Sequence, residues 1–480
     1  MVHDVVIVGA GPVGLFLAVE LATAGVKPLV LERLEEPDRT IKAAAVGVVA
    51  VEALERRGFA PALQAATRAQ LELMQPLLRA RFGATGAKKR PGGHFSGLFL
   101  VDQELQRDPE RHLRPIPQES LERMLNARAA ELGVEVRRGV TLEGFEQDEQ
   151  GVTVGTSAGE LTARYLVGCD GGRSRVRKLA GFEFVGTDPT ITGYQAVIEL
   201  DAPEKLTRGW QRTARGLIVS GVMPDGRVFT AEFAGPPPER DAPITQAEVE
   251  AAIQRVSGTD VKVRSMKMAT RWTDNARQAT TYRSGRVFLA GDAAHVHSPF
   301  GGQGLNLGLV DAANLGFKLA AALRGRERLL DSYTTERHPV AASVLENTRA
   351  QVALMRPDPL TSALRKIVGD VMKLPEGNRY FGEMLTGIGT RYDLGDTHPL
   401  VGTLAKNQPL ALANGRETSL YALMERGGGL FVSPSARALP HGVQSAPTPD
   451  GATLLLRPDG CVAWTDGASQ SLDDALAHWF

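Results

Sequence analysis

The chain has 480 residues, 43% of them hydrophobic and 23% charged, the proportions of an ordinary globular protein with room for two or three domains. Basic and acidic residues number 55 each, so net charge attracts neither nucleic acid nor an acidic membrane, and we expect neither as a partner. The two cysteines, Cys169 and Cys461, lie outside any C-x-x-C motif, which argues against a disulfide scaffold or a zinc ribbon and fits a reducing cytoplasm.

The first residues predict a strand, a glycine-rich turn, a helix and a second strand. Residues 4–9 (DVVIVG) are a run of β-branched apolar residues, typical of a parallel strand buried on both faces. GAGPVG follows, then LFLAVELATAG, which is helical in pattern up to Gly25, and KPLVLE, a strand that ends at Glu32. The stretch is apolar, but no basic segment precedes it and Glu20 interrupts it. We therefore expect a soluble βαβ unit instead of a signal or membrane helix.

The next part of the chain predicts further helices and strands of the same kind. Residues 43–58 are helical in pattern and end at a glycine, and residues 80–97, rich in glycine, lysine and arginine, predict a loop. Residues 119–136 predict a helix that leads into a strand. Residues 151–172 predict a hairpin followed by the buried strand YLVGCD.

A different architecture follows. Residues 191–235 contain alternating stretches (GYQAVIEL, GLIVSGVM, RVFTAEF) that predict an antiparallel sheet inserted between the Rossmann-like pieces. RVFLAGD returns to the buried parallel type, and LNLGLVDAANLGFKLAAALRG predicts a long helix. After about residue 395, short strands with proline- and glycine-rich joints predict a small separate α/β domain.

Three glycines of the first turn have the spacing G-x-G-x-x-G: Gly9, Gly11 and Gly14. Alone this is a weak signal, but here it follows a strand, opens a helix and precedes Glu32 at the end of the next strand. Such glycines let the backbone approach a pyrophosphate, the helix N-terminus offers free N–H groups, and the carboxylate accepts from ribose hydroxyls. The pattern predicts a dinucleotide site without distinguishing NAD from FAD.

Two later motifs are less clear alone. YLVGCDGGRSRVR ends a strand at Asp170 and is by itself typical of a turn with a solvated basic face. GDAAHVHSPFGGQGLNLG offers Asp292, His295 and His297 as metal-ligand types, but no further ligand cluster accompanies them, and it lacks the Gly-Lys-Ser/Thr ending of a phosphate loop. A strand end, a glycine-rich passage and a helix from Leu305 fit a cradle for a flat ring whose negative charge the helix N-terminus would stabilise. We expect no metal and two structural histidines.

Together and in this order, the three motifs resemble those of class A FAD-dependent aromatic hydroxylases, the p-hydroxybenzoate hydroxylase fold, from residue 4 to about 350. In that family the first motif binds the ADP part of FAD, the D-G stretch serves FAD and NAD(P)H, and the third holds the ribityl chain and isoalloxazine. TRWTDNARQATTYRSGRVFLAGDAAHVHSPFGGQGLNLG, TERHPVAASVLENTRAQVALMRPD and GHFSGLFLVD resemble, more narrowly, the branch that hydroxylates tetracycline-type polyketides and rifamycin-like antibiotics.

The resemblance implies an α/β fold: a Rossmann-like FAD-binding domain with an inserted antiparallel-sheet substrate domain and a small C-terminal thioredoxin-like domain lacking redox cysteines. The expected boundaries are 1–180 plus 268–350 for the FAD-binding domain (with part of the substrate side at 75–115), 181–267 for the substrate sheet, 351–394 for a helical connection and 395–480 for the C-terminal domain.

The resemblance also implies roles for single residues. Gly9, Gly11 and Gly14 would face the pyrophosphate, Glu32 the adenosine ribose and Asp292 the ribityl hydroxyls. Gln118 would contact the flavin and Pro299 lie beside it, while Gly304, Leu305 and Asn306 would offer groups to its pyrimidine edge. The remaining expected cofactor contacts are Pro12, Val13, Arg33, Leu142, Asp170 and Gly302. Lys42 stands where the family commonly has arginine, and keeps the charge but loses the bidentate fork.

The implied reaction is flavin monooxygenation. NADPH or NADH would reduce FAD, and O₂ would form a C4a-hydroperoxyflavin that hydroxylates a small polycyclic aromatic molecule of the polyketide type, so few acid–base residues are needed. The substrate would lie between the flavin and the inserted sheet, with Phe95, Met223, Phe229 and Phe233 as candidate lining residues. We expect a cytoplasmic monomer or homodimer that spans no membrane.

Three alternatives stay open at this point. A Baeyer–Villiger or epoxidising flavin monooxygenase would share the scaffold, and no feature of the sequence excludes it. A flavin reductase or dehydrogenase would use no O₂. A flavin-binding partner without turnover is disfavoured because all three motifs are intact.

Overall fold

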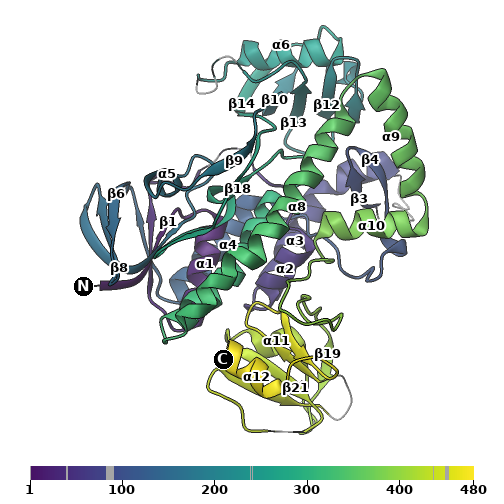
Figure 1. The fold of residues 1–480 in the computed structure, drawn as a ribbon. Helices are drawn as coiled ribbons and strands as arrows, with labels where there is room; N and C mark the ends of the chain where they lie inside the picture. The colour runs from purple at the N-terminus through teal and green to yellow at the C-terminus, as the bar shows by residue number, and fades with distance from the viewer. Residues whose placement is uncertain are drawn as a thin grey trace.

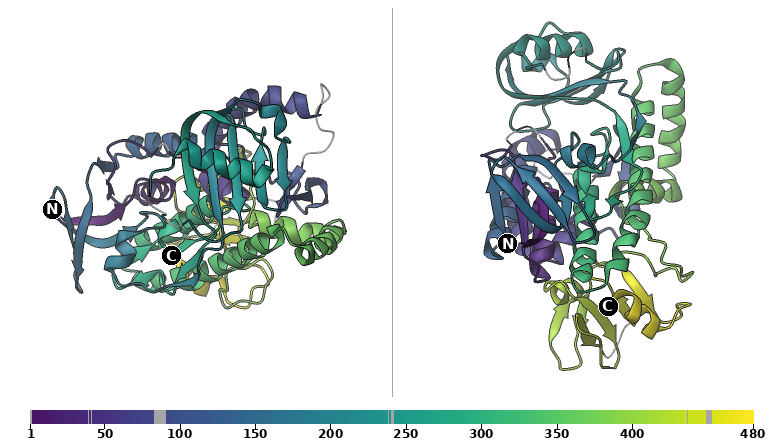
Figure 2. Two further views of the ribbon diagram at one scale, coloured as in Figure 1. Left: turned by 90° about the horizontal axis from the view of Figure 1, so that it is seen from above. Right: turned by 60° about the vertical axis from the view of Figure 1, so that its left-hand side comes forward.

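A computed structural model of the chain describes residues 2–38, 40, 42–82, 91–237, 239, 242–435, 437–448 and 453–480. Figure 1 shows a middle part that contains the N-terminal strand, a second sheet with its own helix above it, and the C-terminal part below. The two further views in Figure 2 show the same three parts from above and from the side.

An eight-stranded sheet forms the middle part. Its strands follow the order β16-β17-β8-β1-β2-β5, and β17, β8, β1, β2 and β5 run parallel, as the buried apolar runs predict. An antiparallel pair, β6 and β7, extends the first half of β8. The bounds are β1 (Val2–Val8), β2 (Pro28–Glu32), β5 (Glu135–Arg138), β6 (Leu142–Gln147), β7 (Val152–Thr156), β8 (Gly159–Gly168), β16 (Arg283–Ser284) and β17 (Val287–Leu289).

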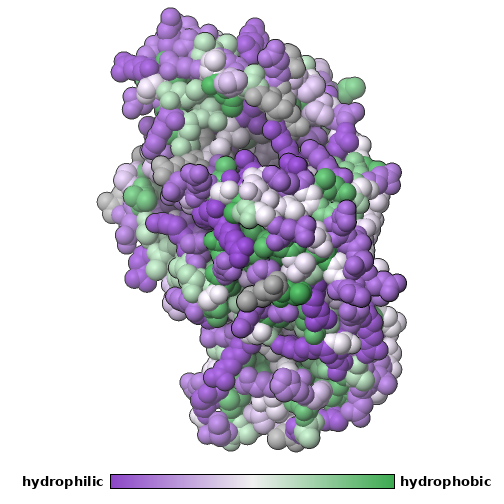
Figure 3. All heavy atoms as spheres, turned by 90° about the vertical axis from the view of Figure 1, so that its left-hand side faces the viewer, coloured by the Kyte–Doolittle hydropathy of each residue, from purple (hydrophilic) through white to green (hydrophobic). Residues whose placement is uncertain are grey.

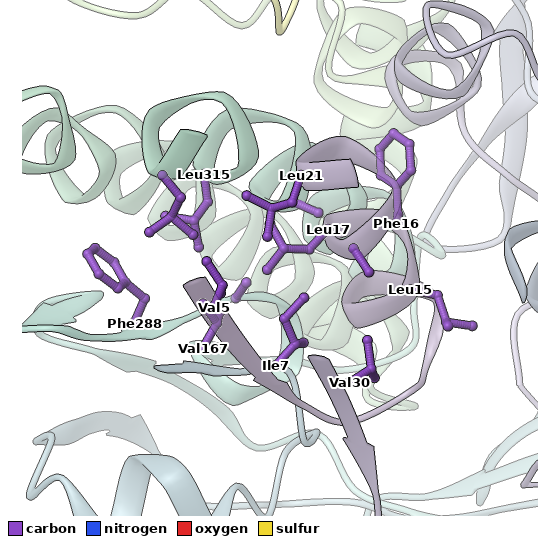
Figure 4. Close-up of a cluster of buried hydrophobic side chains, with 14 of the residues drawn as sticks. Val5, Ile7, Leu15, Phe16, Leu17, Leu21, Val30, Val167, Phe288 and Leu315 are labelled. Carbon is purple, nitrogen blue, oxygen red and sulfur yellow. The ribbon is translucent and has the colours of Figure 1, made fainter. Parts of the chain in front are cut away.

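Helices cover this sheet and bury its apolar strands. In Figure 4, Leu17 and Leu21 of one helix and Leu315 of another lie over Val5 and Ile7, and all five side chains are fully buried. Removing this apolar surface from water is the main favourable contribution to folding of this part. The helices of the middle part are α1 (Pro12–Thr23), α2 (Val48–Glu55), α3 (Ala60–Phe82), α4 (Gln118–Glu131), α5 (Arg175–Leu179), α7 (Gly304–Ala322) and α8 (Asp331–Met355).

Two expectations for this part were wrong in detail. The helix expected over 43–58 begins only at Val48, because Val46 pairs with Arg114 in a β-bridge and Gly47 donates its N–H to a side chain of α7. The loop expected over 80–97 overlaps the end of α3 and contains β3 (Pro91–Phe95), which forms a hairpin with β4 (Leu98–Asp102); residues 83–90 lie outside the described residues.

The second sheet has the order β11-β12-β13-β10-β14 and is antiparallel throughout, as the alternating pattern predicts. One face packs on α6 (Gln246–Ser257) and the other faces the middle part, so successive residues of each strand have opposite neighbours. The bounds are β10 (Thr192–Leu200), β11 (Gly209–Arg212), β12 (Gly216–Ser220), β13 (Arg227–Glu232) and β14 (Val263–Trp272), so the sheet continues past residue 267.

Smaller elements connect these layers. A three-stranded sheet of β9 (Phe184–Thr187), β15 (Ala276–Ala279) and β18 (His295–Val296) lies between the second sheet and the middle part in Figure 1. The helices α9 (Pro359–Met372) and α10 (Pro375–Thr386) pack on the β3–β4 hairpin. Short 3-10 turns are η1 (Gln103–Leu105), η2 (Pro203–Lys205), η3 (Gly291–Ala293) and η4 (Glu327–Leu330).

The C-terminal part is a small α/β unit whose first strand begins at Pro409. A sheet of order β22-β21-β23-β24 has β21 and β22 parallel and the other pairs antiparallel. Both cysteines of the chain are free. The bounds are β19 (Pro409–Ala411), β20 (Glu417–Ser419), α11 (Leu420–Met424), β21 (Gly429–Ser433), β22 (Val443–Pro447), β23 (Leu454–Leu456), β24 (Val462–Thr465) and α12 (Leu472–Trp479).

The outer surface is mixed. On the face drawn in Figure 3, hydrophilic residues predominate and apolar ones are scattered among them. Among the described residues, no helix combines the length and the apolar character that crossing a membrane requires.

A buried ionic network joins the C-terminal part to the middle part. Arg457, after β23, donates two hydrogen bonds to the carboxylate of Glu336 on α8, at 2.9 and 2.8 Å, and also binds Asp459. Asn314 of α7 donates to both carboxylates, and Lys318 Nζ lies 2.9 Å from Glu336 Oε2. Burial raises the pKa of Glu336, but the charges of Arg457 and Lys318 outweigh it and hold that pKa well below its usual range.

We expect Arg457→Met to destabilise the protein strongly, because only Lys318 would then balance Glu336 and Asp459, which leaves one buried negative charge uncompensated. The cost of such an uncompensated charge is about 3–5 kcal/mol in the free energy of unfolding. Thermal and urea unfolding would measure it. The matched control is Arg437→Met in the same part of the chain, whose ion pair with Asp473 is exposed and should contribute little. Equal losses in the two variants would contradict a stabilising role for the buried network.

Candidate functional site

A cavity of about 2590 Å³ lies where the carboxyl ends of the parallel strands face the second sheet. A pocket for one drug-sized ligand is typically about 300–1,000 Å³, so this cavity has room for more than one molecule. It brings together the cofactor residues expected from the sequence, all except Gly14: Gly9, Gly11, Pro12, Val13, Glu32, Arg33, Lys42, Gln118, Leu142, Asp170, Asp292, Pro299, Gly302, Gly304, Leu305 and Asn306.

The three glycines of the first turn have different surroundings. Gly9 has φ +109°, and a Cβ there would lie 2.4 Å from the carbonyl oxygen of Cys169. A Cβ on Gly14 would lie 2.0 Å from the carbonyl oxygen of Gly9, so this glycine lets α1 pack against the end of β1 and lies outside the cavity lining. A Cβ on Gly11 would meet no atom within 4 Å, so the cavity is open beside its backbone. Of these three glycines, Gly11 is therefore the one that a ligand can approach most closely.

The helix that follows this turn offers free donors. Gly11 is the N-cap of α1 and, having no side chain, makes no capping hydrogen bond to the first turn. Unpaired N–H groups and the helix dipole favour an anion at this end. The carboxylate of Glu32 accepts from the N–H groups of Ala10 (2.8 Å) and Leu34 (3.0 Å), which fixes it at the end of β2 beside this anion site.

Lys42 and Gln118 lie on a third side of the cavity. Lys42 Nζ is 3.1 Å from Asp38 Oδ2 and 3.8 Å from Glu122 Oε1, and Gln118 donates to the same Glu122 oxygen at 2.8 Å. Gln118 also donates its N–H to the carbonyl of Ala43, which joins the start of α4 to the extended residues before α2. The lysine charge is therefore shared with two carboxylates.

The second motif connects the end of β8, α5 and the third motif by hydrogen bonds. The carboxylate of Asp170 accepts from Ser174 Oγ (2.5 Å) and from the N–H groups of Arg175 (2.6 Å) and Val176, so it caps α5 at the edge of the cavity. Arg177 donates to the carbonyl oxygens of Ala293 and Gly172, at 2.8 Å each. The sequence alone was typical of a solvated basic face, but one of these basic residues, Arg177, is bonded to the third motif.

A buried carboxylate, that of Asp311, anchors the third motif. Asp311 of α7 accepts from the N–H of Gly291 (3.1 Å) and contacts His295 Nε2 (2.6 Å), while Arg337 of α8 donates to its other oxygen (2.8 Å). All three side chains are 0–1% exposed. Burial raises the pKa of Asp311, but the charges of Arg337 and His295 outweigh it, and the net pKa lies below the usual value. His295 therefore serves the scaffold and does not line the cavity.

Other polar groups of the motif are left open toward the cavity. No hydrogen bond or ion pair reaches the Asp292 carboxylate from the described part of the chain. His297 donates through Nδ1 to the carbonyl of Ser298, and its Nε2 is buried without a partner in the described residues. Asn306 accepts from the N–H of Gly47 (2.6 Å) and donates to the carbonyl of Gly302 (2.9 Å), which closes α7 onto the residues before α2.

The substrate side differs from the expectation. Phe229 lines the cavity and stacks on Trp272 at a centroid distance of 4.8 Å and an interplanar angle of 20°. Phe95 is 4% exposed and packs in an apolar core with Phe381, because neighbouring residues on a strand point to opposite sides. Met223 and Phe233 also lie outside the lining, Met223 in the turn after β12 and Phe233 after the end of β13.

Sequence reasoning did not single out several residues that line this side. They belong to β3, β10, β11 and β14, and strand alternation could have suggested them once the inward face of the sheet was known. They are His94, Gln195, Trp210, Thr270 and Trp272.

The donor set fits an FAD. A glycine backbone and a free helix N-terminus can receive a pyrophosphate, and the carboxylates of Glu32 and Asp292, which both line the cavity, could accept hydrogen bonds from ribose or ribityl hydroxyls. The start of α7 lies beside a glycine-rich loop that leaves clearance for a flat ring. Within the described ranges, no group of three or more His, Cys, Asp or Glu side chains could hold a metal ion.

The chain matches the family model described as an FAD binding domain over residues 2–348 and the one described as aromatic-ring hydroxylase, C-terminal, over residues 398–480. Rifampicin monooxygenase of Streptomyces venezuelae is 40% identical over 494 residues, covering 99% of this chain and 98% of the relative. The 12-dehydrotetracycline 5-monooxygenase/anhydrotetracycline 6-monooxygenase of Streptomyces rimosus is 39% identical, covering 100% and 99%. The solved structure of the anhydrotetracycline hydroxylase OxyS from Streptomyces rimosus is 38% identical, with a TM-score of 0.84 over 100% of this chain and 99% of that one.

We expect Gly11→Ala and Gly14→Ala to have opposite consequences. At Gly11 the new methyl group enters open space, so unfolding of the FAD-free protein should change little while the Kd for FAD rises about tenfold or more. At Gly14 it would collide with backbone, so stability of the FAD-free protein itself should fall by about 1–3 kcal/mol. Calorimetric titration with FAD and thermal unfolding separate the two. If Gly11→Ala binds FAD like the parent, the pyrophosphate does not lie at this turn.

We expect Asp292→Asn to weaken FAD binding by about tenfold, because a carboxylate accepts hydrogen bonds from hydroxyls more strongly than an amide does. The fold should be unaffected, since the carboxylate has no partner among the described residues. The matched control is Asp170→Ala, which should lower the melting temperature because it removes the acceptor for Ser174 Oγ and for the first two N–H groups of α5. FAD affinity that is unchanged in Asp292→Asn would place the ribityl chain elsewhere.

Proposed function

Since this chain belongs to the FAD-dependent aromatic-ring hydroxylases, we propose that it hydroxylates a planar polycyclic aromatic molecule of the polyketide type. The enzyme is a flavin monooxygenase, and its cofactors are FAD, a reduced nicotinamide nucleotide and O₂. The relatives named above act, by their names, on rifampicin and on tetracycline intermediates, which supports a substrate with several fused rings.

The observation that carries the substrate class is the aromatic wall of the cavity, formed by Trp210, Phe229 and Trp272. Phe229 is stacked with Trp272 and with Trp210, at centroid distances of 4.8 and 6.5 Å. Phe300 meets the same wall edge-on, 5.6 Å from Trp272. Large aromatic side chains bury a flat apolar ligand efficiently and at little cost in side-chain entropy. A fused-ring substrate fits this slot better than a small or flexible molecule.

The residues of this chain have binding and orienting roles in the reaction. The redox chemistry would come from bound FAD, which can accept a hydride from NAD(P)H and activate O₂ for the transfer of one oxygen atom. The first turn and α1 would hold its pyrophosphate, and the N-terminus of α7 would stabilise negative charge beside Gly304 and Leu305. The aromatic wall would orient the ring and exclude water from it.

Two features of the protein bear on its location in the cell. Its two cysteines are free and its reaction consumes NAD(P)H, which supports a cytoplasmic location. We propose a monomer or homodimer that acts on a small molecule, with no nucleic-acid partner.

The test is anaerobic stopped-flow of the FAD-loaded protein with NADPH and with NADH, across a panel of polycyclic phenols. We expect the substrate class to accelerate flavin reduction by several orders of magnitude, and one atom of ¹⁸O₂ to appear as a ring hydroxyl by mass and NMR. A ring-expanded lactone would instead identify a Baeyer–Villiger enzyme. Turnover without label in the product would identify a reductase. FAD binding with no NAD(P)H oxidation on any member would overturn the proposal in favour of a non-catalytic flavin protein.

A further inference from the structure

One polar aromatic side chain on the substrate side has no role so far. His94 on β3 lines the cavity next to the aromatic wall, and its ring centroid lies 4.5 Å from that of Trp210 and 4.8 Å from that of Phe99. Its neighbour Phe95 points the other way, into the core beneath the hairpin. His94 is thus the residue through which β3 contributes a polar side chain to the cavity lining.

The hydrogen bonds of His94 settle which ring nitrogen carries the proton. The backbone N–H of Gly97 donates to Nδ1 at 3.2 Å, so Nδ1 is the acceptor and the neutral ring carries its proton on Nε2. Burial, and then the charge of Arg365, lower the pKa of His94 to about 4, so the ring is neutral near pH 7. Among the residues that the structure describes, none hydrogen-bonds to Nε2. The free group is therefore a neutral N–H donor.

The turn that follows β3, two residues after His94, is strained and is held by hydrogen bonds. Ser96 has φ +53°, a conformation that costs an L-residue roughly 1–2 kcal/mol, and no other non-glycine residue in the described part of the chain has positive φ. Gln351 of α8 accepts from the Ser96 N–H through Oε1 (3.2 Å), and its carbonyl accepts from Ser96 Oγ (2.9 Å). Both residues are 0% exposed. Strain that surrounding contacts hold in place is a feature of functional sites.

The clamp continues to the other side of the cavity. Gln351 donates to Asn347 (3.1 Å), and Asn347 donates to Gln303 (2.7 Å), the N-cap residue of α7 that lines the cavity. We call Ser96, Gln351, Asn347 and Gln303 the amide chain; every member is buried. A Cβ on Gly301 would lie 2.6 Å from Gln351 Nε2, so the same side chain also packs against the glycine-rich loop. The loop and the hairpin are therefore tied together through one buried connection.

We propose that His94 is a substrate-positioning residue whose Nε2–H donates a hydrogen bond to an oxygen substituent of the aromatic substrate. This inference rests on the proposed function and narrows the substrate class to polycycles that carry a phenolic or carbonyl oxygen at the edge beside β3. The amide chain fixes the distance between this donor and the loop 299–304. The ring carbon that faces the loop is then chosen by where the oxygen is held, because a planar ligand in the slot can otherwise slide along the wall.

The test uses the FAD-loaded protein with oxidised flavin and no reductant, so that binding is measured apart from turnover. The probes are anthracene, 9,10-anthraquinone and 1-hydroxyanthraquinone, which share one ring frame and differ in oxygen substituents. Kd values come from quenching of tryptophan fluorescence. We expect the parent protein to bind an oxygenated probe about tenfold or more tightly than anthracene, as one desolvated hydrogen bond provides.

Two variants of His94 separate hydrogen bonding from packing. His94→Phe keeps a ring between Trp210 and Phe99 but has no donor, so it should lose the preference for oxygenated probes and still bind anthracene like the parent. His94→Gln keeps an N–H donor and should restore most of the preference. A purely structural role would move all three affinities together. A preference that His94→Phe retains, or a parent protein that shows none, would overturn the proposal.

The amide chain has its own test. Gln351→Leu removes the clamp on Ser96 and should reduce the preference for oxygenated probes while His94 is intact. Ser96→Gly is the control. Glycine adopts positive φ without strain, and its backbone N–H can still donate to Gln351 Oε1. Equal preferences in Gln351→Leu and the parent would exclude the chain from positioning His94. Failure of the proposed function would show instead as absence of ¹⁸O-labelled product, whatever the binding preferences are.

Discussion

The buried carboxylate of Asp311 is the interaction on which the cavity depends. It accepts from the backbone of Gly291 and contacts His295, both in the third motif, and Arg337 of α8 compensates its charge. A carboxylate without such partners would be costly to bury, and removal of one partner typically costs about 3–5 kcal/mol. Because the three groups need one another, the strand end, α7 and α8 have a single relative arrangement. The start of α7 therefore lies where a flavin ring could meet it.

Close backbone approaches complete this arrangement. A Cβ on Gly308 would lie 2.7 Å from a methyl group of Val13 and 3.0 Å from Gly291 Cα, so α7 touches the first turn and the third motif at once. Asn306 then joins α7 to Gly47. Segments far apart in the sequence thereby surround one cavity, and the side chains that do so are mostly engaged with the protein itself. The groups left free, such as the Asp292 carboxylate and the N-terminus of α1, are those that a ligand can use.

Polar side chains in buried positions divide into two kinds here. Those of the Arg457 network and of Asp311 satisfy one another and hold parts of the fold together. The amide chain also satisfies its members, but its last contact holds Ser96 in a strained conformation at the edge of the cavity. Strain there has no stabilising effect of its own. The strained turn instead fixes the position of the neutral His94 imidazole beside the aromatic wall.

Local patterns in the sequence predicted much of the fold and of the cofactor half of the site. The buried apolar runs indicated parallel strands, and the glycine spacing placed the turn before α1, because such signals depend on neighbours a few residues apart. The helix over 43–58 was placed too early, since Val46 pairs with Arg114, a residue that no local pattern connects to it. The hairpin was missed because a serine, instead of glycine or asparagine, occupies the first position of its turn.

The sequence by itself determined the parallel strands, the order of the three motifs and the family they belong to, because these depend on residue types at short, fixed spacings. The tertiary structure alone decided which face of each strand meets the cavity. Phe95 and His94 are adjacent, and only the packing of the hairpin on α9 and α10 sends the phenylalanine into the core and the histidine to the substrate side. Because side chains alternate along a strand, a shift of one residue would place the apolar Phe95 at the cavity instead of the hydrogen-bond donor His94.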